Sequence, residues 1–247
     1  MKTVILVIGV LVCIIAVHAV TGQHPHEGSI IYEVKVNMHR TLPPERKEMK
    51  EMIPEYNSFR DKLVFRGTES LYTPLEDEIE EEFSDEGGGM RMRIRRPMME
   101  YYLNTESGKK IRAQEFMGKK YLILDSLAIL PWKLMGGKKI IQGYECKSAS
   151  YFNEKRKQNV VVWYAETLRP FGGPENYNTL PGTVMQVDIN EGERTITAVD
   201  VSLKALKKNE IKEPSSGQPI NENEFRSLVE EQMKRMNSRD GMIIRTN

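Results

Sequence analysis

The side chains that could carry catalysis are few and poorly placed. A Ser or Cys nucleophile needs a histidine nearby as its base, and all four histidines lie within the first 39 residues. Cys146 has no base close to it in the sequence, so we expect a buried, inert thiol. Acidic residues are abundant, which leaves a carboxylate pair for glycoside hydrolysis open, but nothing marks a particular pair. We therefore predict no catalytic residue, with an enzyme as the alternative.

Thioether and imidazole groups form the one suggestive set of metal ligands. His24 and His26 are separated by one residue, as are Met90 and Met92, and such ligands suit copper(I). Methionine is also a gap-filling core residue, so copper handling is an alternative rather than the prediction. The acidic run 76–86 holds eight carboxylates but lacks the spacing of an EF-hand loop. No cofactor is predicted.

The first residues are typical of an export signal. Lys2 precedes 14 apolar residues, Val4–Val17, a length that matches the ~7–15 residues of a signal-peptide core and falls short of the ~20 that span a bilayer. Small residues suit cleavage after Ala19 or after Gly22. We prefer the second site, which makes residues 1–22 the signal peptide. An uncleaved membrane anchor is the alternative.

Removal of the signal peptide leaves a chain whose charges balance. The whole chain has 36 basic and 35 acidic residues, and only Lys2 is lost, so 35 of each remain. This balance gives no electrostatic case for nucleic acid or an anionic membrane as a partner. Cys13 is lost too, so Cys146 is the only remaining thiol and no internal disulfide can form. We expect one domain, residues 23–247, that is exported, has no membrane span after cleavage, and is periplasmic or associated with the outer membrane.

Apolar and polar residues alternate through most of this domain, at the period of a half-buried β-strand. Short turns separate the runs, which favours antiparallel hairpins. In the last run Ile196 and Ala198 are apolar at even positions, whereas Val199 and Val201 are apolar at odd ones. That slip of one residue predicts a β-bulge. The main strands are expected at 29–38, 62–65, 70–72, 112–117, 121–124, 139–150, 160–164, 182–189 and 195–203.

Helices are expected only near the two ends of the domain. A short one should begin near Pro44 and stop at Pro54. A C-terminal amphipathic helix is predicted over 221–237, with Asn221 and Glu224 forming a capping box and with an apolar stripe of Phe225, Leu228, Val229, Met233 and Met236. This stripe should pack on the domain, or alternatively bind a partner. The acidic and Gly-rich segment 76–89 is expected to be a flexible hairpin tip or a solvated loop, and the alternation of apolar residues with arginine that follows it, at 90–95, is again typical of a strand.

A series of short motifs runs through the second half of the chain. In order, they are Gly143, Tyr144 and Cys146 of a Gly-Tyr-x-Cys strand, Trp163 and Tyr164 of the next strand, Gly173 and Pro174 of a loop, and Leu180, Pro181 and Gly182 of a second loop. This order resembles the GLPGLI family, exported proteins of Gram-negative envelopes with no established activity. Thr179, Thr183 and Val184 depart from the hexapeptide that names the family. The resemblance implies an antiparallel, bowl-like or half-barrel sheet.

The motif residues favour a structural role, with a place beside a binding site as the alternative. The Leu-Pro-Gly loop offers shape and backbone constraint but no proton or charge, and Thr179 is the local side chain that could hydrogen-bond a ligand. Trp163 and Tyr164 point to opposite faces of their strand. One of them therefore belongs to the core, and the other could line a concave face.

Together these observations predict a mainly β fold: an antiparallel bowl-like or half-barrel sheet with a short N-terminal helix and a C-terminal amphipathic helix. We expect a non-enzymatic binding or accessory protein whose concave face takes an envelope component or a small amphiphilic ligand. The alternatives are a hydrolase with carboxylates in the concave face and a periplasmic copper-handling protein. An uncharged, apolar concavity would favour ligand binding, a buried cluster of acids would favour the enzyme, and converging Met and His would favour copper.

Overall fold

The computed structural model describes residues 27–75, 80–84, 91–95, 98–169 and 172–243. The expected signal peptide lies outside these ranges, so its cleavage remains a prediction. Within the described ranges, no helix is both long enough and apolar enough to cross a membrane.

Most of the described chain belongs to one open sheet of 12 strands. Their order across the sheet is β14-β8-β7-β6-β3-β2-β1-β13-β12-β11-β10-β9. Neighbouring strands run antiparallel, except that β14 pairs parallel with β8. The predicted fold class is thereby confirmed. The strands of this sheet are β1 (Glu27–Asn37), β2 (Tyr56–Arg66), β3 (Glu69–Pro74), β6 (Met99–Asn104), β7 (Lys109–Phe116), β8 (Lys119–Ser126), β9 (Lys133–Ile141), β10 (Tyr144–Asn153), β11 (Gln158–Ala165), β12 (Thr183–Ile189), β13 (Arg194–Ser202) and β14 (Gln218–Asn221).

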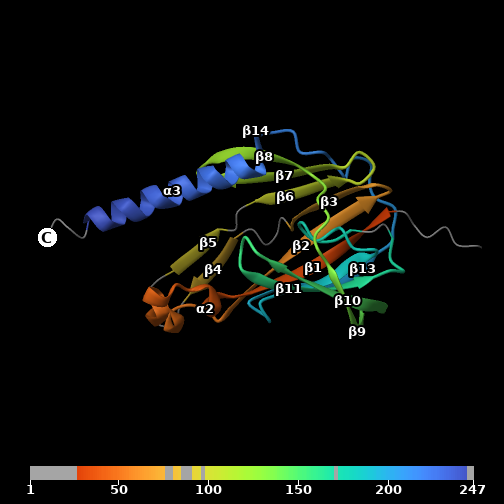
Figure 1. Cartoon of the computed structure of the whole chain (residues 1–247), viewed down its shortest axis with the longest axis horizontal. Coiled ribbons are helices and arrows are strands. Elements are labelled where there is room, and N and C mark those ends of the chain that lie inside the picture. The colour runs from red at the N-terminus through yellow and green to blue at the C-terminus, as the bar shows by residue number, and fades with distance from the viewer. Residues whose placement is uncertain (1–26, 76–79, 85–90, 96–97, 170–171, 244–247) are drawn as a thin grey trace, which may run out of the picture.

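The sheet curls into an open bowl (Figure 1). Strands β6, β7, β8 and β14 form one wall, and β9, β10 and β11 form the opposite wall. Between them lie β1, β2, β3, β12 and β13. Residues far apart in the sequence, such as those of β7 and β10, therefore face one another across the bowl.

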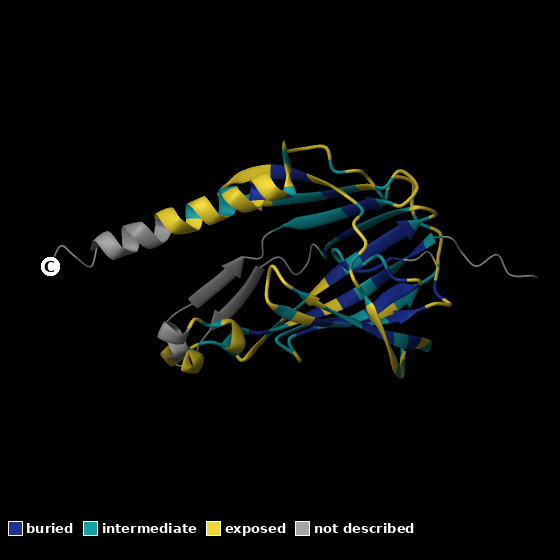
Figure 2. Cartoon of the chain, viewed as in Figure 1, coloured by how far each residue is buried: buried dark blue, intermediate teal, exposed yellow. Residues whose placement is uncertain are grey.

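The hydrophobic core lies on the concave face of the sheet. In β1, Ile30, Tyr32 and Val34 are fully buried. Glu33 and Lys35, on the other face of the strand, are exposed, because side chains alternate along a strand. The buried Tyr32 hydroxyl donates a hydrogen bond to the carbonyl of Val184, at 2.7 Å. Figure 2 shows the buried residues (dark blue) following the central strands and exposed residues (yellow) along the C-terminal helix.

A β-bulge interrupts the pairing of β1 with β13, as the sequence predicted. Ile31 pairs with Asp200 and Tyr32 with Ala198, so Val199 is the extra residue. The bulge allows β13 to keep its apolar residues on the core face on both sides of the slip.

Two short helical segments follow β1, and a long helix ends the described chain. They are α2 (Met38–Thr41), the 3-10 helix η1 (Pro44–Glu51) and α3 (Glu222–Ile243). The predicted capping box of α3 is present: the backbone N–H of Glu224 donates to Asn221 Oδ1 at 2.9 Å, and the N–H of Asn221 donates to the Glu224 carboxylate at 3.1 Å.

The C-terminal helix differs from the prediction in length and in how much of it packs. It continues to Ile243, beyond the predicted end at 237. Phe225, Leu228 and Val229 pack against β8, but Met233 is 55% exposed, because the helix extends past the edge of the sheet (Figure 1). Of the predicted apolar stripe, Phe225, Leu228 and Val229 are therefore used within the domain and Met233 is not, while the side chain of Met236 lies outside the described part of the chain.

The acidic and Gly-rich segment forms part of a hairpin, one of the two forms that we expected for it. Part of it is strand β4 (Glu80–Ser84), which pairs antiparallel with β5 (Arg91–Arg95) in a separate two-stranded sheet. Each acidic position Glu80 and Glu82 stands opposite an arginine, Arg95 and Arg93 respectively. Alternation along the chain and opposite charges across it favour a hairpin over a loop.

Candidate functional site

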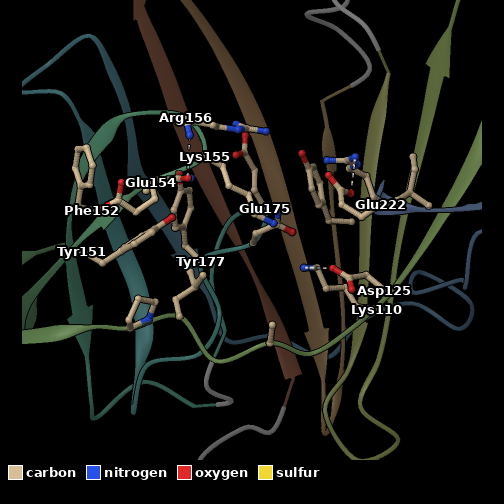
Figure 3. A pocket seen from close by; sticks show the side chains of 18 residues that line it. Lys110, Asp125, Tyr151, Phe152, Glu154, Lys155, Arg156, Glu175, Tyr177 and Glu222 are labelled. Atoms are coloured by element: carbon tan, nitrogen blue, oxygen red, sulfur yellow. Dashed lines mark hydrogen bonds and ion pairs between the residues drawn. The ribbon is translucent and has the colours of Figure 1, made fainter. Parts of the chain in front are cut away.

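A cavity of about 440 Å³ opens on the concave face of the bowl. Its side chains come from both walls and from two connecting segments, as Figure 3 shows. The residues that line it are Tyr101, Lys110, Arg112, Ile123, Asp125, Ala128, Leu130, Pro131, Tyr151, Phe152, Asn153, Glu154, Lys155, Arg156, Glu175, Asn176, Tyr177 and Glu222.

Strand register explains why these residues meet. Ile123, Arg112 and Tyr101 are cross-strand partners in β8, β7 and β6, so they point to the same face. On the other wall Tyr151 is in register with Val160 of β11 and, through β12, with Arg194 of β13. Cross-strand partners share a face of a sheet, and the curl of this sheet turns the two rows toward each other.

The turn between β10 and β11 forms one rim of the cavity. Asn153 closes this turn, since its Oδ1 accepts the backbone N–H of Arg156 at 3.2 Å. Lys155 and Arg156 stand at the tip and are exposed. Below them Tyr151 packs edge-on against Trp132, with ring centroids 4.8 Å apart. The rim therefore combines two cations with an aromatic wall.

The opposite wall is built around Arg112 of β7, whose side chain reaches two residues of α3. Its guanidinium pairs with Glu222 at 2.9 Å and stands 5.5 Å from the ring centroid of Phe225. Lys110 pairs with Asp125 at 3.5 Å on the same wall. Figure 3 shows Lys110, Asp125 and Glu222 facing the Tyr151 side across the cavity.

Glu175 occupies the floor in a backbone conformation that is unusual for a side chain larger than glycine. Its φ of 52° lies in the left-handed region, which costs energy for a non-glycine residue. The compensation is an ion pair of both carboxylate oxygens with Arg194, whose pKa is raised chiefly by Glu175 against the opposing effect of burial. Such strained, ion-paired positions are common at binding sites.

Three tyrosines give the cavity an aromatic, hydrogen-bonding wall that stays neutral. Burial is the main cause that raises the pKa values of Tyr101, Tyr151 and Tyr177 above the usual value. In all three the positive charge of Arg156 acts in the opposite direction. The positive charge of the Arg156 guanidinium therefore acts on all three tyrosines of this wall.

Every carboxylate that lines the cavity has a basic partner. Asp125 pairs with Lys110, Glu222 with Arg112, Glu175 with Arg194, and Glu154 with Lys157. Within the described ranges, the side chains of Lys155 and Arg156 form no such pair. The cavity therefore combines neutralised acids with two available cations.

The Gly-Tyr-x-Cys residues lie away from the cavity. Gly143 and Gln142 form the tight turn between β9 and β10, both with positive φ, and a Cβ at Gly143 would meet nothing within 4 Å. Gly143 is therefore a turn residue. We had expected it inside a strand, so that prediction is wrong. Tyr144 is half-buried, and Cys146 is fully buried, with a thiol pKa raised by burial.

Neither aromatic residue of the Trp-Tyr strand lines the cavity. Tyr164 is buried and belongs to the main core. Trp163 lies on the opposite, convex face, in register with Ser148 and Gln186, with the Lys139 amine 4.2 Å from its ring centroid. The hypothesis that one of this pair lines the concave face is wrong for Trp163, which the strand's alternation turns outward.

The two motif loops close the end of the core beside the cavity. A Cβ on Gly173 would lie 2.0 Å from the carbonyl oxygen of Tyr177, and one on Gly182 would lie 2.6 Å from that of Ala165. Pro174 and Leu180 are buried, and Pro181 is exposed. None of the four motif residues Gly173, Pro174, Leu180 and Gly182 lines the cavity, but the spacer between them supplies Glu175, Asn176 and Tyr177.

Thr179 connects these loops to the cavity wall. Its hydroxyl accepts the indole N–H of Trp132 at 3.0 Å, and Trp132 in turn packs on Tyr151. The side chain that could have bound a ligand directly is therefore engaged in holding a residue behind the wall.

The candidate copper ligands fall largely outside the described residues. His24, His26 and Met90 lie there, and of Met92 only the backbone, in β5, is described. Among the described residues, no three His, Cys, Asp or Glu side chains are grouped so that they could hold a metal ion.

Comparison with known proteins adds a fold but no family. No family model matches the sequence, and no curated protein matches it. Two solved structures of PNGF-II, in the P21 and C2 space groups, match with a TM-score of 0.56 each, at 14% and 15% sequence identity. They cover 83% and 82% of this chain, which spans only 33% and 32% of theirs. At this identity the likeness shows a shared β fold and nothing about activity.

The residues that sequence reasoning missed are those of the cavity itself. Lys155 and Arg156 belong to the turn between two expected strands, 139–150 and 160–164, and Arg112 to the start of another expected strand. No sequence signal joined them, because they meet only through the curl of the sheet. One available signal was the Glu-Asn-Tyr spacer at 175–177, which is too polar for the core segment that surrounds it.

Proposed function

We propose that this protein is an exported, non-enzymatic binding or accessory protein, and that it binds a small amphiphilic ligand in the cavity on its concave face. The observation that carries the proposal is the cavity of about 440 Å³ with tyrosines, apolar side chains and charged groups converging on it. Sites for small molecules typically measure ~300–1,000 Å³ and combine an apolar wall with a few placed polar groups. Export and membership of the GLPGLI family are part of the same proposal.

The lining is not the uncharged, apolar concavity that we had named as favouring ligand binding, because charged side chains contribute to it; it supports an amphiphilic ligand over a purely apolar one. Ile123, Leu130 and Pro131 offer apolar contact, while the opposite rim carries Lys155 and Arg156. A hydrocarbon would displace water from these charged groups without forming hydrogen bonds to them, which would lower its affinity. A molecule with an apolar body and a polar head would satisfy both parts of the cavity.

The hydrolase alternative has no support in the described residues. A glycosidase needs one carboxyl group that stays protonated and a second that stays charged. Here each lining acid is held in an ion pair with a basic side chain, so no described carboxylate of the cavity stands unpaired as a candidate general acid. The acids therefore act as structural partners of basic side chains.

A thermal-shift experiment tests the proposal on residues 23–247. The probes share one octyl chain and differ in their head groups: octanoate, octylamine and octyl glucoside. A ligand at 100 times its Kd stabilises the folded state by ~2.7 kcal/mol, which for a domain of this size raises the melting temperature by roughly 5–11 °C.

A cavity-filling variant identifies the site of binding. Ala128 lines the cavity, so Ala128→Trp should abolish the shift. Ala205 is exposed and does not line it, so Ala205→Trp should leave the shift unchanged. If no probe raises the melting temperature, or if both variants respond like the unmodified protein, the proposed site is wrong.

A further inference from the structure

We infer that the ligand of this cavity is an anion, an amphiphile whose acidic head group is bound by Lys155 and Arg156 and whose apolar body lies against Tyr151 and Tyr177. The inference rests on the proposed function and adds the chemical class of the ligand. A carboxylate, a sulfonate and a phosphate ester share the chemistry that these residues recognise.

The charge balance of the lining carries this inference. All four acidic side chains of the cavity are neutralised by basic partners. Two of those partners, Lys110 and Arg112, are themselves cavity residues. The charge that the rim can still offer to a ligand is therefore the charge of Lys155 and Arg156, and it is positive.

The geometry of the rim suits an anionic head group. Lys155 and Arg156 are adjacent at the tip of one turn, and the Asn153 side chain that fixes the backbone of Arg156 also lines the cavity. Figure 3 places both cations at the same end of the cavity as Tyr151 and Tyr177. A guanidinium next to an ammonium provides several charge-assisted donors for one acidic group, directly beside an aromatic surface.

Two further polar atoms at the cavity point to a ligand with hydrogen-bonding groups. Arg112 Nε, a donor, and Asn176 Oδ1, an acceptor, have no hydrogen-bond partner within the described part of the chain. Both atoms are buried. Buried polar groups are usually hydrogen-bonded, and polar groups on the part of the ligand away from its acidic head, an acceptor for Arg112 Nε and a hydroxyl or amine for Asn176 Oδ1, would supply both partners.

A matched pair of fluorescent probes tests the inference. The anion 8-anilinonaphthalene-1-sulfonate and the uncharged N-phenyl-1-naphthylamine share one ring system and differ by the sulfonate. Titration of residues 23–247 should show at least about tenfold tighter binding of the sulfonate, the difference that charge-assisted hydrogen bonds typically give. Added salt should weaken binding of the sulfonate while leaving the uncharged probe unchanged.

Variants assign the effect to the rim. Lys155→Gln/Arg156→Gln should lower the affinity for the sulfonate by about tenfold or more and change that for the uncharged probe by less than about twofold. The control Lys119→Gln/Lys120→Gln removes the same charge from the exposed start of β8, outside the cavity, and should change neither. Melting curves of both double variants check that they fold.

The outcomes separate this inference from the function on which it rests. Equal affinity for the two probes, with binding lost in Ala128→Trp, would overturn the anion and leave a binding cavity in place. Equal losses from the rim variant and its control would also overturn the anion, because the effect would then be one of net charge. Binding of neither probe, or binding that survives Ala128→Trp, would overturn the function and the inference together.

Discussion

Replacing Gly182 by alanine should destabilise the protein strongly, although it adds a single carbon atom. An ideal Cβ at this position would lie 2.6 Å from the carbonyl oxygen of Ala165, 2.8 Å from its carbonyl carbon and 2.9 Å from Cδ2 of Tyr164. Two of these atoms belong to the backbone of β11, so the clash cannot be relieved by a side-chain rotation. Over-packing of this kind typically costs ~1–3 kcal/mol, and backbone contacts should place Gly182→Ala at about 3 kcal/mol.

Equilibrium unfolding in urea measures this effect, with a second glycine as the matched control. A Cβ at Gly136 would meet nothing within 4 Å, and this glycine is exposed in β9, so Gly136→Ala should change stability by less than about 0.5 kcal/mol. For a domain of this size, about 3 kcal/mol corresponds to a loss of roughly 6–12 °C in melting temperature. A Gly182→Ala protein as stable as Gly136→Ala would refute the close-approach argument for the Leu-Pro-Gly loop.

Three further predictions follow from other parts of the chain. Cys146 is fully buried and its thiol pKa is raised by burial, so the native protein should react with a thiol reagent far more slowly than the unfolded one; equal rates would show that the thiol is accessible. The pKa of Glu210 is lowered chiefly by its hydrogen bond to Lys62. This interaction stabilises the folded state at pH values above the pKa that Glu210 has in the unfolded chain, and the stabilisation is lost as the pH falls through the pKa of Glu210 in the folded protein. Glu210→Gln should therefore cost up to about 1 kcal/mol at neutral pH and almost nothing near pH 3, whereas a loss that is the same at both pH values would contradict the ion pair. N-terminal mass spectrometry of envelope fractions should find Gln23 first, and an intact Met1 would contradict cleavage.

The strands and the helix cap were predictable because they depend on residues close in sequence. Alternation located β1 and the hairpin of β12 and β13, and a slip in that alternation located the bulge at Val199. Asn221 and Glu224 sit three residues apart in a capping box. In each case the interaction that fixes the structure lies within a few residues, where periodicity and side-chain chemistry can be interpreted directly.

Errors arose where a residue's role depended on a distant neighbour. Gly143 was expected inside one strand, 139–150, but forms a turn with positive φ, because this segment consists of two adjacent strands, β9 and β10. Trp163 was a candidate for the concave face, yet the register of β11 with β12 places it on the convex one. Met233 continues the apolar stripe of α3 but is exposed, because the helix extends beyond the edge of the sheet on which the earlier residues of the stripe pack.

The cavity was beyond prediction because its residues are each ordinary in sequence. Arg112 looks like an outward-facing strand residue until β6 and β8 place it in one row with Tyr101 and Ile123. Lys155 and Arg156 look like solvent-facing turn residues until the sheet curls and brings β10 opposite β7. Curvature is a property of the whole sheet, and no local pattern records it.

In the segment 173–182, some residues fix the course of the backbone and others line the cavity. Gly173 and Gly182 permit close backbone approaches that only glycine allows, which fixes the two ends of the segment between them. That segment carries Glu175 and Tyr177 into the cavity, and Thr179 holds Trp132 behind Tyr151. Fixed ends of this kind restrict where the intervening side chains can lie, so that Glu175 and Tyr177 stay at the cavity. This explains why Gly173 and Gly182 lie next to the cavity, while the charged Glu175 and the hydroxyl-bearing Tyr177 lie in its lining.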